Sequence, residues 1–94
     1  MKHAGDDALD VLEPLIAELR TLVGPKEKKR GVFYLKSRAF LHFHEDPAGY
    51  FCDVRLEPDA DFERLPVNTK LQQNDLLNRV KSTLDAPGQG RPNP

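Results

Sequence analysis

The sequence predicts a two-layer α+β domain, in which an antiparallel sheet of three to four strands carries an N-terminal and a C-terminal helix on one face. Apolar residues recur at helical spacing before residue 24 and again after residue 70, and residues 32–56 alternate between apolar and polar. With 94 residues, 38% of them hydrophobic, the chain fits one small domain. We expect this domain to span residues 1–86, with a flexible tail at 87–94 that is too poor in apolar residues to fold.

The first helix is expected to begin at Asp6 or Asp7, since either side chain can accept hydrogen bonds from free backbone N–H groups. Pro14 either kinks this helix or starts a second one, because proline removes a helical hydrogen bond. Gly24 and Pro25 are expected to end the element. Its apolar stripe follows helical spacing and consists of Leu9, Leu12, Leu15, Ile16, Leu19, Leu22 and Val23.

Three strands are expected at residues 32–36, 39–44 and 50–56, joined by a tight turn at 37–38 and a loop at 46–49. The register of the second hairpin follows from its apolar residues. A four-residue loop pairs Leu41 with Val54 and His42 with Asp53, which keeps the apolar side chains on one face. A three-residue loop would instead oppose Leu41 to Arg55 and mix the two faces, so we favour the first register.

The last part of the sequence predicts an edge element and a helix. Residues 62–67 are expected to form a fourth strand or an extended segment, and Pro66 restricts it to an edge of the sheet. Thr69 and Gln72 match a capping box, in which each side chain accepts a hydrogen bond from the other residue's backbone. The buried stripe of the helix is expected to comprise Leu76, Leu77, Val80 and Leu84, with Leu71 at the first turn.

The sheet face opposite the helices is the main candidate for a binding surface, because it would expose rings and ionisable groups together. Monomeric proteins rarely expose several aromatic side chains in one patch. We therefore predict a non-catalytic protein-interaction or accessory module, with a protein partner or a second copy of the chain on this face. The candidate residues are Tyr34, Phe40, His42, His44, Phe51, Asp53 and Arg55.

A metal site is the alternative for the same face. His42 and His44 lie two residues apart on one predicted strand, so both imidazoles point the same way, and Asp53 or Glu45 offers a carboxylate as third ligand. Apart from this possibility, the sequence indicates no cofactor.

Catalysis is a weaker interpretation of the same residues. His42 oriented by Asp53 would form half of a general-base arrangement. A nucleophile is missing, however, since Cys52 should face the other way and Ser37 lies in a turn. We therefore predict that the protein is not an enzyme.

Charge and composition bear on nucleic acids, membranes and location. Lys26, Lys28, Lys29 and Arg30 form a basic cluster on the predicted loop 26–30, the only candidate site for nucleic acid. The chain as a whole has 14 basic and 15 acidic residues, which argues against a nucleic-acid partner. An acidic N-terminal segment and the absence of long apolar runs predict no signal peptide and no membrane association. A single cysteine favours a reducing compartment, so we expect a cytoplasmic protein.

Residues 37–46, Ser-Arg-Ala-Phe-Leu-His-Phe-His-Glu-Asp, resemble the hairpin Arg-x-Phe-Leu-His-x-His-x-Asp of the small luciferase-associated domain of uncharacterised bacterial proteins. The likeness extends over about residues 31–84, through Asp53 and the paired leucines of the last helix. The family's glycine-tryptophan segment has no counterpart, since this chain contains no tryptophan. The resemblance implies an α+β fold and an accessory role in a bacterial protein, and it assigns no catalytic role to His42 or His44.

Overall fold

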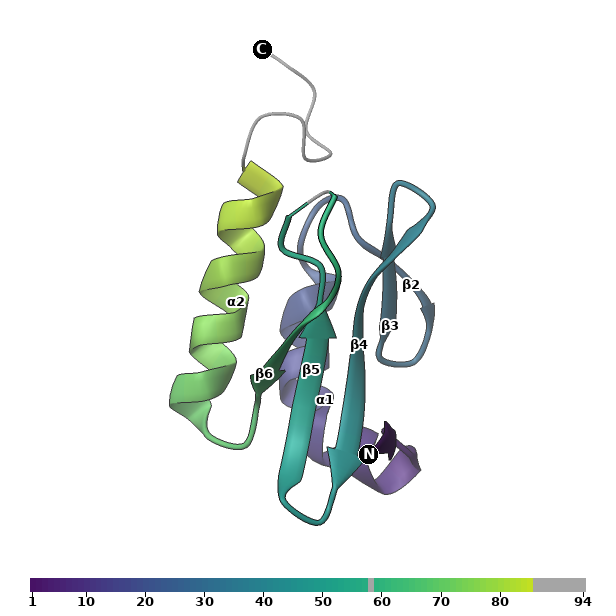
Figure 1. The fold of residues 1–94 in the computed structure, drawn as a ribbon, viewed down its shortest axis with the longest axis vertical. Helices are drawn as coiled ribbons and strands as arrows, with labels where there is room; N and C mark the ends of the chain where they lie inside the picture. Colours follow the sequence, from purple (N-terminus) through teal and green to yellow (C-terminus); the bar gives the residue numbers. More distant parts are fainter. Residues whose placement is uncertain (58, 86–94) are drawn as a thin grey trace.

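The computed structural model describes residues 1–57 and 59–85, so the predicted tail at 87–94 and the domain limit at residue 86 lie outside the described residues. Two helices and an antiparallel sheet confirm the α+β class (Figure 1). The elements in chain order are β1 (Lys2–His3), α1 (Asp6–Arg20), β2 (Lys26–Lys29), β3 (Val32–Leu35), β4 (Arg38–Asp46), β5 (Gly49–Val54), β6 (Glu63–Pro66) and α2 (Lys70–Asp85).

The prediction of three to four strands is wrong, because the sheet formed by the described residues has six strands. Five of them follow the order β2-β3-β4-β5-β6, and the short β1 pairs with the end of β4 that β3 does not reach. The two strands missed by the sequence analysis are β1 and β2, and neither has an alternating apolar pattern.

Strand β2 occupies the segment that was predicted to be a charged loop. It pairs with β3 at the edge of the sheet, where lysine side chains can stay in solvent and discourage pairing with another chain. Glu27 turns inward instead and accepts hydrogen bonds from the Arg20 side chain at 2.6 and 3.1 Å and from the Gly31 backbone at 2.9 Å. These contacts explain why a segment of low strand propensity is ordered here.

Helix α1 differs from the prediction at both ends. Gly5 is its N-cap residue, and the predicted caps Asp6 and Asp7 lie in the first turn. Pro14 lies inside one continuous helix rather than starting a second. The helix ends at Arg20, before Gly24 and Pro25, because the next two backbone N–H groups bond three residues back in a tightened turn. As a result Val23, predicted in the buried stripe, is 86% exposed.

The register of the second hairpin is confirmed. Leu41 pairs with Val54 and His42 pairs with Asp53, and the strands close at the pair Asp46 and Gly49. The preceding turn lies one residue earlier than predicted: Lys36 and Ser37 have positive φ angles of 52° and 68°.

The C-terminal elements agree with the sequence. Strand β6 lies at the edge of the sheet, and Pro66 is its last residue. The capping box is formed, since Thr69 Oγ1 accepts from the Gln72 backbone and Gln72 Oε1 accepts from the Thr69 backbone, both at 3.1 Å. The predicted stripe of α2 is buried, whereas Leu71 is 80% exposed.

One hydrophobic core joins both helices to the sheet. Helix α1 runs behind β4 and β5 in Figure 1, and α2 lies next to β6. Cys52 and Val54 of β5 are fully buried in this core together with Leu12, Ile16, Leu76 and Val80 of the helices. Side chains alternate along a strand, so Asp53, between Cys52 and Val54, points to the opposite face. No helix within the described ranges has the length and apolar character needed to span a membrane.

Candidate metal centre

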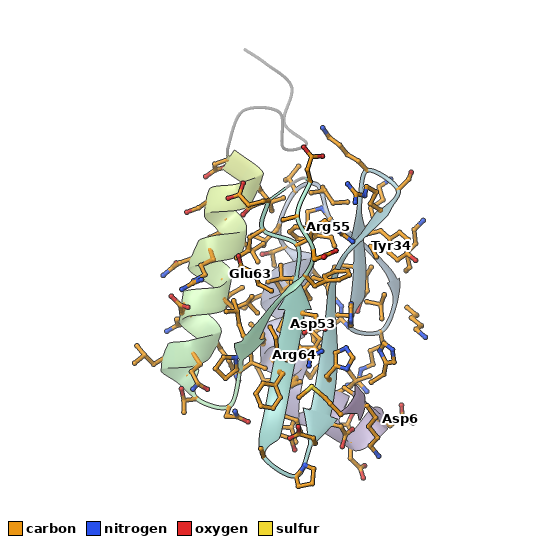
Figure 2. The ribbon with its side chains drawn as sticks, viewed as in Figure 1. Asp6, Tyr34, Asp53, Arg55, Glu63 and Arg64 are labelled. Carbon is orange, nitrogen blue, oxygen red and sulfur yellow. The ribbon has the colours of Figure 1, made fainter. Side chains whose placement is uncertain are left out.

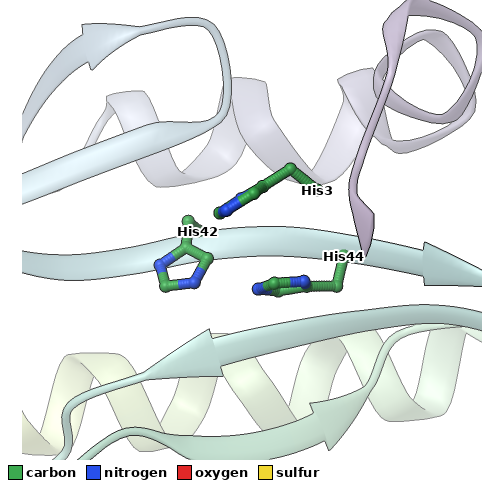
Figure 3. Close-up of side chains that lie close together, drawn as sticks. All are labelled: His3, His42 and His44. Atoms are coloured by element: carbon green, nitrogen blue, oxygen red, sulfur yellow. The ribbon is translucent and has the colours of Figure 1, made fainter. Parts of the chain in front are cut away.

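All three histidines of the chain meet on the sheet face opposite the core. The ring centroids of His42 and His44 are 4.8 Å apart, and the ring of His3 lies 4.7 Å from that of His44 and 5.4 Å from that of His42. Each imidazole offers one nitrogen, and these three nitrogens lie within 4.8 Å of one another (Figure 3).

Backbone pairing explains how the three rings come together. His42 and His44 alternate along β4, so they share a face, and β1 places His3 directly opposite His44. Side chains of directly paired residues on antiparallel strands point the same way. Sequence analysis missed His3, because a two-residue strand has no pattern of its own.

Asp53 lies beside two of the imidazoles. Its Oδ2 atom is 3.6 Å from Nε2 of His42 and 3.3 Å from Nε2 of His44. Arg64 on the neighbouring β6 donates to both carboxylate oxygens, at 2.7 and 2.8 Å (Figure 2). Asp53 is only 7% exposed, so this pair of hydrogen bonds holds the carboxylate in one orientation.

The surroundings favour neutral imidazoles. Burial lowers the pKa of His42, and the neighbouring His44 lowers it further, while Asp53 acts in the opposite direction. Burial also lowers the pKa of His44 despite the nearby Asp53. Hydrogen bonds from Arg64 lower the pKa of Asp53, which therefore stays ionised. Neutral imidazole and ionised carboxylate are the forms that bind a metal ion.

The ring nitrogens of His44 are buried and lack regular hydrogen bonds. The Lys2 backbone and the Asp53 carboxylate lie close enough to favour its charged form. Even so, neither Nδ1 nor Nε2 makes a hydrogen bond of acceptable geometry to any described part of the chain. Buried polar atoms are usually satisfied, so an unsatisfied pair of this kind suggests a ligand.

Phe62 and Arg55 border the cluster on one side. The Phe62 ring meets His42 edge-on at 4.9 Å, and the Arg55 guanidinium lies 4.4 Å from the centre of the Phe62 ring. Arg55 also donates to the backbone oxygens of Ala39 and Ala60, at 3.2 and 2.6 Å. The predicted binding residue Arg55 therefore connects β4 to the loop between β5 and β6, next to the site.

Phe40 does not lie on the binding face, where the sequence analysis predicted it. It is 3% exposed and belongs to the hydrophobic core. The pairing of β3 with β4 shifts at this point, because Phe33 opposes Leu41 whereas Tyr34 opposes Ala39, so Phe40 is an extra residue. In such a bulge strict alternation fails, and Phe40 and Leu41 both enter the core.

The remaining aromatic candidates lie apart from one another. Phe51 is half-buried on β5, paired with His44 on one side and Pro66 on the other. Tyr34 is half-buried on β3, and the Lys28 ammonium lies 5.8 Å from the centre of its ring. The structure therefore brings together His42, His44 and Asp53 but separates Tyr34 from them.

The basic cluster predicted for nucleic acid is divided by the fold. Arg30 forms ion pairs with Asp10 and Glu13, both at 2.9 Å, so its charge is directed toward α1. Lys26, Lys28 and Lys29 lie on β2 and are exposed.

The single cysteine is not a reactive group. Cys52 is fully buried, and its burial raises the pKa of the thiol. A buried, protonated thiol is a poor nucleophile.

In comparisons with known proteins, no family model, no curated protein and no solved structure matches this chain. The resemblance to the luciferase-associated domain therefore stays a prediction, and the functional argument depends on the geometry of the site.

Proposed function

We propose that the protein binds a divalent first-row transition metal ion, such as Zn²⁺ or Ni²⁺, through His3, His42 and His44. The convergence of all three histidines of the chain on one patch of the sheet carries this proposal. Imidazole nitrogen suits zinc, nickel and copper, whereas magnesium and calcium prefer sites made of oxygen ligands alone.

The position of Asp53 supports the proposal. Two ligands of a tetrahedral zinc ion, each about 2.0–2.1 Å from the metal, lie about 3.3–3.4 Å apart. The distances from Asp53 Oδ2 to the Nε2 atoms of His44 and His42 are 3.3 and 3.6 Å. Asp53 is thus placed to add an oxygen beside the nitrogens, while Arg64 keeps its carboxylate oriented.

The interaction or accessory module remains the second candidate function, on the open face of a two-layer domain. It has less support than the metal site, because Phe40 contributes to the core and no longer to the proposed surface. Tyr34 and Phe51, which are half-buried, are the aromatic residues left from the original set.

Calorimetry and elemental analysis of the untagged protein test the metal site. We expect one Zn²⁺ or Ni²⁺ per chain and a rise in melting temperature, because an ion at about 100 times its Kd stabilises the folded state by about 2.7 kcal/mol. Loss of a residue that only orients a metal ligand weakens metal binding by about 10- to 100-fold. His42→Ala and His44→Ala each remove a ligand itself, so each should weaken binding by more than that. Asn74→Ala, on the exposed surface of α2, is the matched control and should bind normally. Absence of both heat and thermal shift in the unmodified chain would exclude the proposal.

A further inference from the structure

We infer that the metal ion controls the docking of the N-terminal strand: when an ion is bound, β1 is held on β4, and without the ion β1 detaches more readily. The inference rests on the proposed metal site and concerns how that site is assembled. Two observations carry it, the short length of β1 and the buried nitrogens of His44 beside it.

Strand β1 is short and is held mainly by backbone pairing. It has only two residues, both exposed, which pair with Glu45 and His44 of β4. The two residues after the strand also form hydrogen bonds. The Ala4 backbone donates to the Phe43 carbonyl at 3.0 Å, and the Gly5 backbone donates to Glu45 Oε2 at 2.7 Å. Segments with little buried apolar surface open locally at a much lower free energy than the core of a protein.

A second observation concerns the His44 ring that lies beside β1. With β1 in place and His3 stacked at 4.7 Å, both ring nitrogens of His44 are buried without regular hydrogen bonds. Leaving a buried polar atom without a full hydrogen-bond partner destabilises the folded state, which is a cost. A metal ion removes this cost where it coordinates a His44 nitrogen, and it attaches His3 to β4 through a second bond.

Linkage then gives the direction of the effect. Only the docked strand places His3 within reach of the other two imidazoles. An ion that binds all three therefore favours the docked state by its difference in affinity between the two states. By the same relation, anything that weakens docking must weaken metal binding.

Amide hydrogen exchange measured by NMR on the untagged chain tests the inference. With Zn²⁺ at about 100 times its Kd, exchange of the Ala4 and Gly5 amides should slow by on the order of 10- to 100-fold relative to protein in a chelator. The Arg55 amide, which donates to the Phe40 carbonyl inside the sheet, serves as reference and should change less. His42→Ala leaves the acceptors of the Ala4 and Gly5 amides in place and removes one imidazole, so it should lose the zinc effect.

Substitutions at Glu45 give a second, independent readout. Glu45→Ala removes the acceptor for Gly5 without removing an imidazole, so zinc affinity should fall about 2- to 10-fold, the equivalent of one hydrogen bond. Glu45→Gln keeps an acceptor oxygen and should retain most of the affinity.

The possible outcomes separate the two proposals. Zinc that binds at one ion per chain without slowing the Ala4 and Gly5 amides overturns strand docking and leaves the metal site intact. Equal losses in Glu45→Ala and Glu45→Gln also overturn it, because they would assign the effect to the charge of Glu45. Absence of zinc binding in the unmodified chain overturns both proposals.

Discussion

Arg64 donates two hydrogen bonds to Asp53, at 2.7 and 2.8 Å, on the side of the sheet where Asp53 Oδ2 faces both His42 and His44. The carboxylate is almost completely buried, whereas the Arg64 side chain is about half exposed. Strand β6 therefore contributes an arginine that orients a carboxylate of β5, and that carboxylate lies next to the imidazoles of β4.

Asp53→Asn should weaken metal binding by about 10- to 100-fold without abolishing it. The amide lacks the negative charge that attracts the cation, while the three imidazoles remain. Competition with a chromophoric chelator measures the change. Asp75→Asn, on the exposed side of α2, is the matched control and should leave affinity unaltered. Unchanged affinity in Asp53→Asn would show that Asp53 takes no part in the site.

The stability of the metal-free protein should increase with pH as the histidines lose their protons. The folded state lowers the pKa of His42 and His44 below 6.5, so below that pH the unfolded chain binds more protons than the folded one. We expect the free energy of unfolding, measured by urea denaturation in a chelator, to rise as the pH approaches 6.5 and to level off above it.

Three other ionisable groups, Asp53, His3 and Arg64, face these imidazoles. Asp53 favours the protonated forms of His42 and His44, whereas His3 and Arg64 oppose them, and burial has the largest effect. In the double variant His42→Gln/His44→Gln the slope between pH 5 and 6.5 should become smaller. A stability that falls with rising pH in this range would mean that ion pairs with Asp53 dominate.

Phe40→Ala should destabilise the protein by about 3–5 kcal/mol, because it removes a buried ring from the core. Phe51→Ala is the matched comparison, since Phe51 is half-buried on the histidine face and should cost less. Urea denaturation of both variants measures the difference. Equal losses would place Phe40 at the surface, as the simple alternation of β4 predicted.

Thr69→Ala should cost about 1 kcal/mol of stability, the usual effect of removing an N-cap side chain. Thr69 Oγ1 accepts a hydrogen bond from the Gln72 backbone at the start of α2. Thr69→Ser keeps this acceptor and should be close to the unmodified protein in a thermal melt. If both variants are equally destabilised, the loss comes from the methyl group and not from the cap.

Local patterns in the sequence determined the central hairpin and the last helix. Keeping apolar side chains on one face admits a single register, so the pairs of Leu41 with Val54 and of His42 with Asp53 followed from alternation alone. The capping box of Thr69 and Gln72 was equally readable, since its two hydrogen bonds join residues three apart. In both cases the information lies within a few residues of the interaction.

Tertiary structure alone decided the placement of Phe40, Glu27 and His3. Phe40 is buried in the core because of a bulge in β4. Strand β2 is stabilised by the hydrogen bond from Arg20 to Glu27. His3 lies next to His44 because β1 pairs with the end of β4. Each of these depends on contacts between separate elements of the fold, which the spacing of residues within one element does not encode. Strand alternation thus placed two imidazoles on one face, and only backbone pairing across the fold supplied the third.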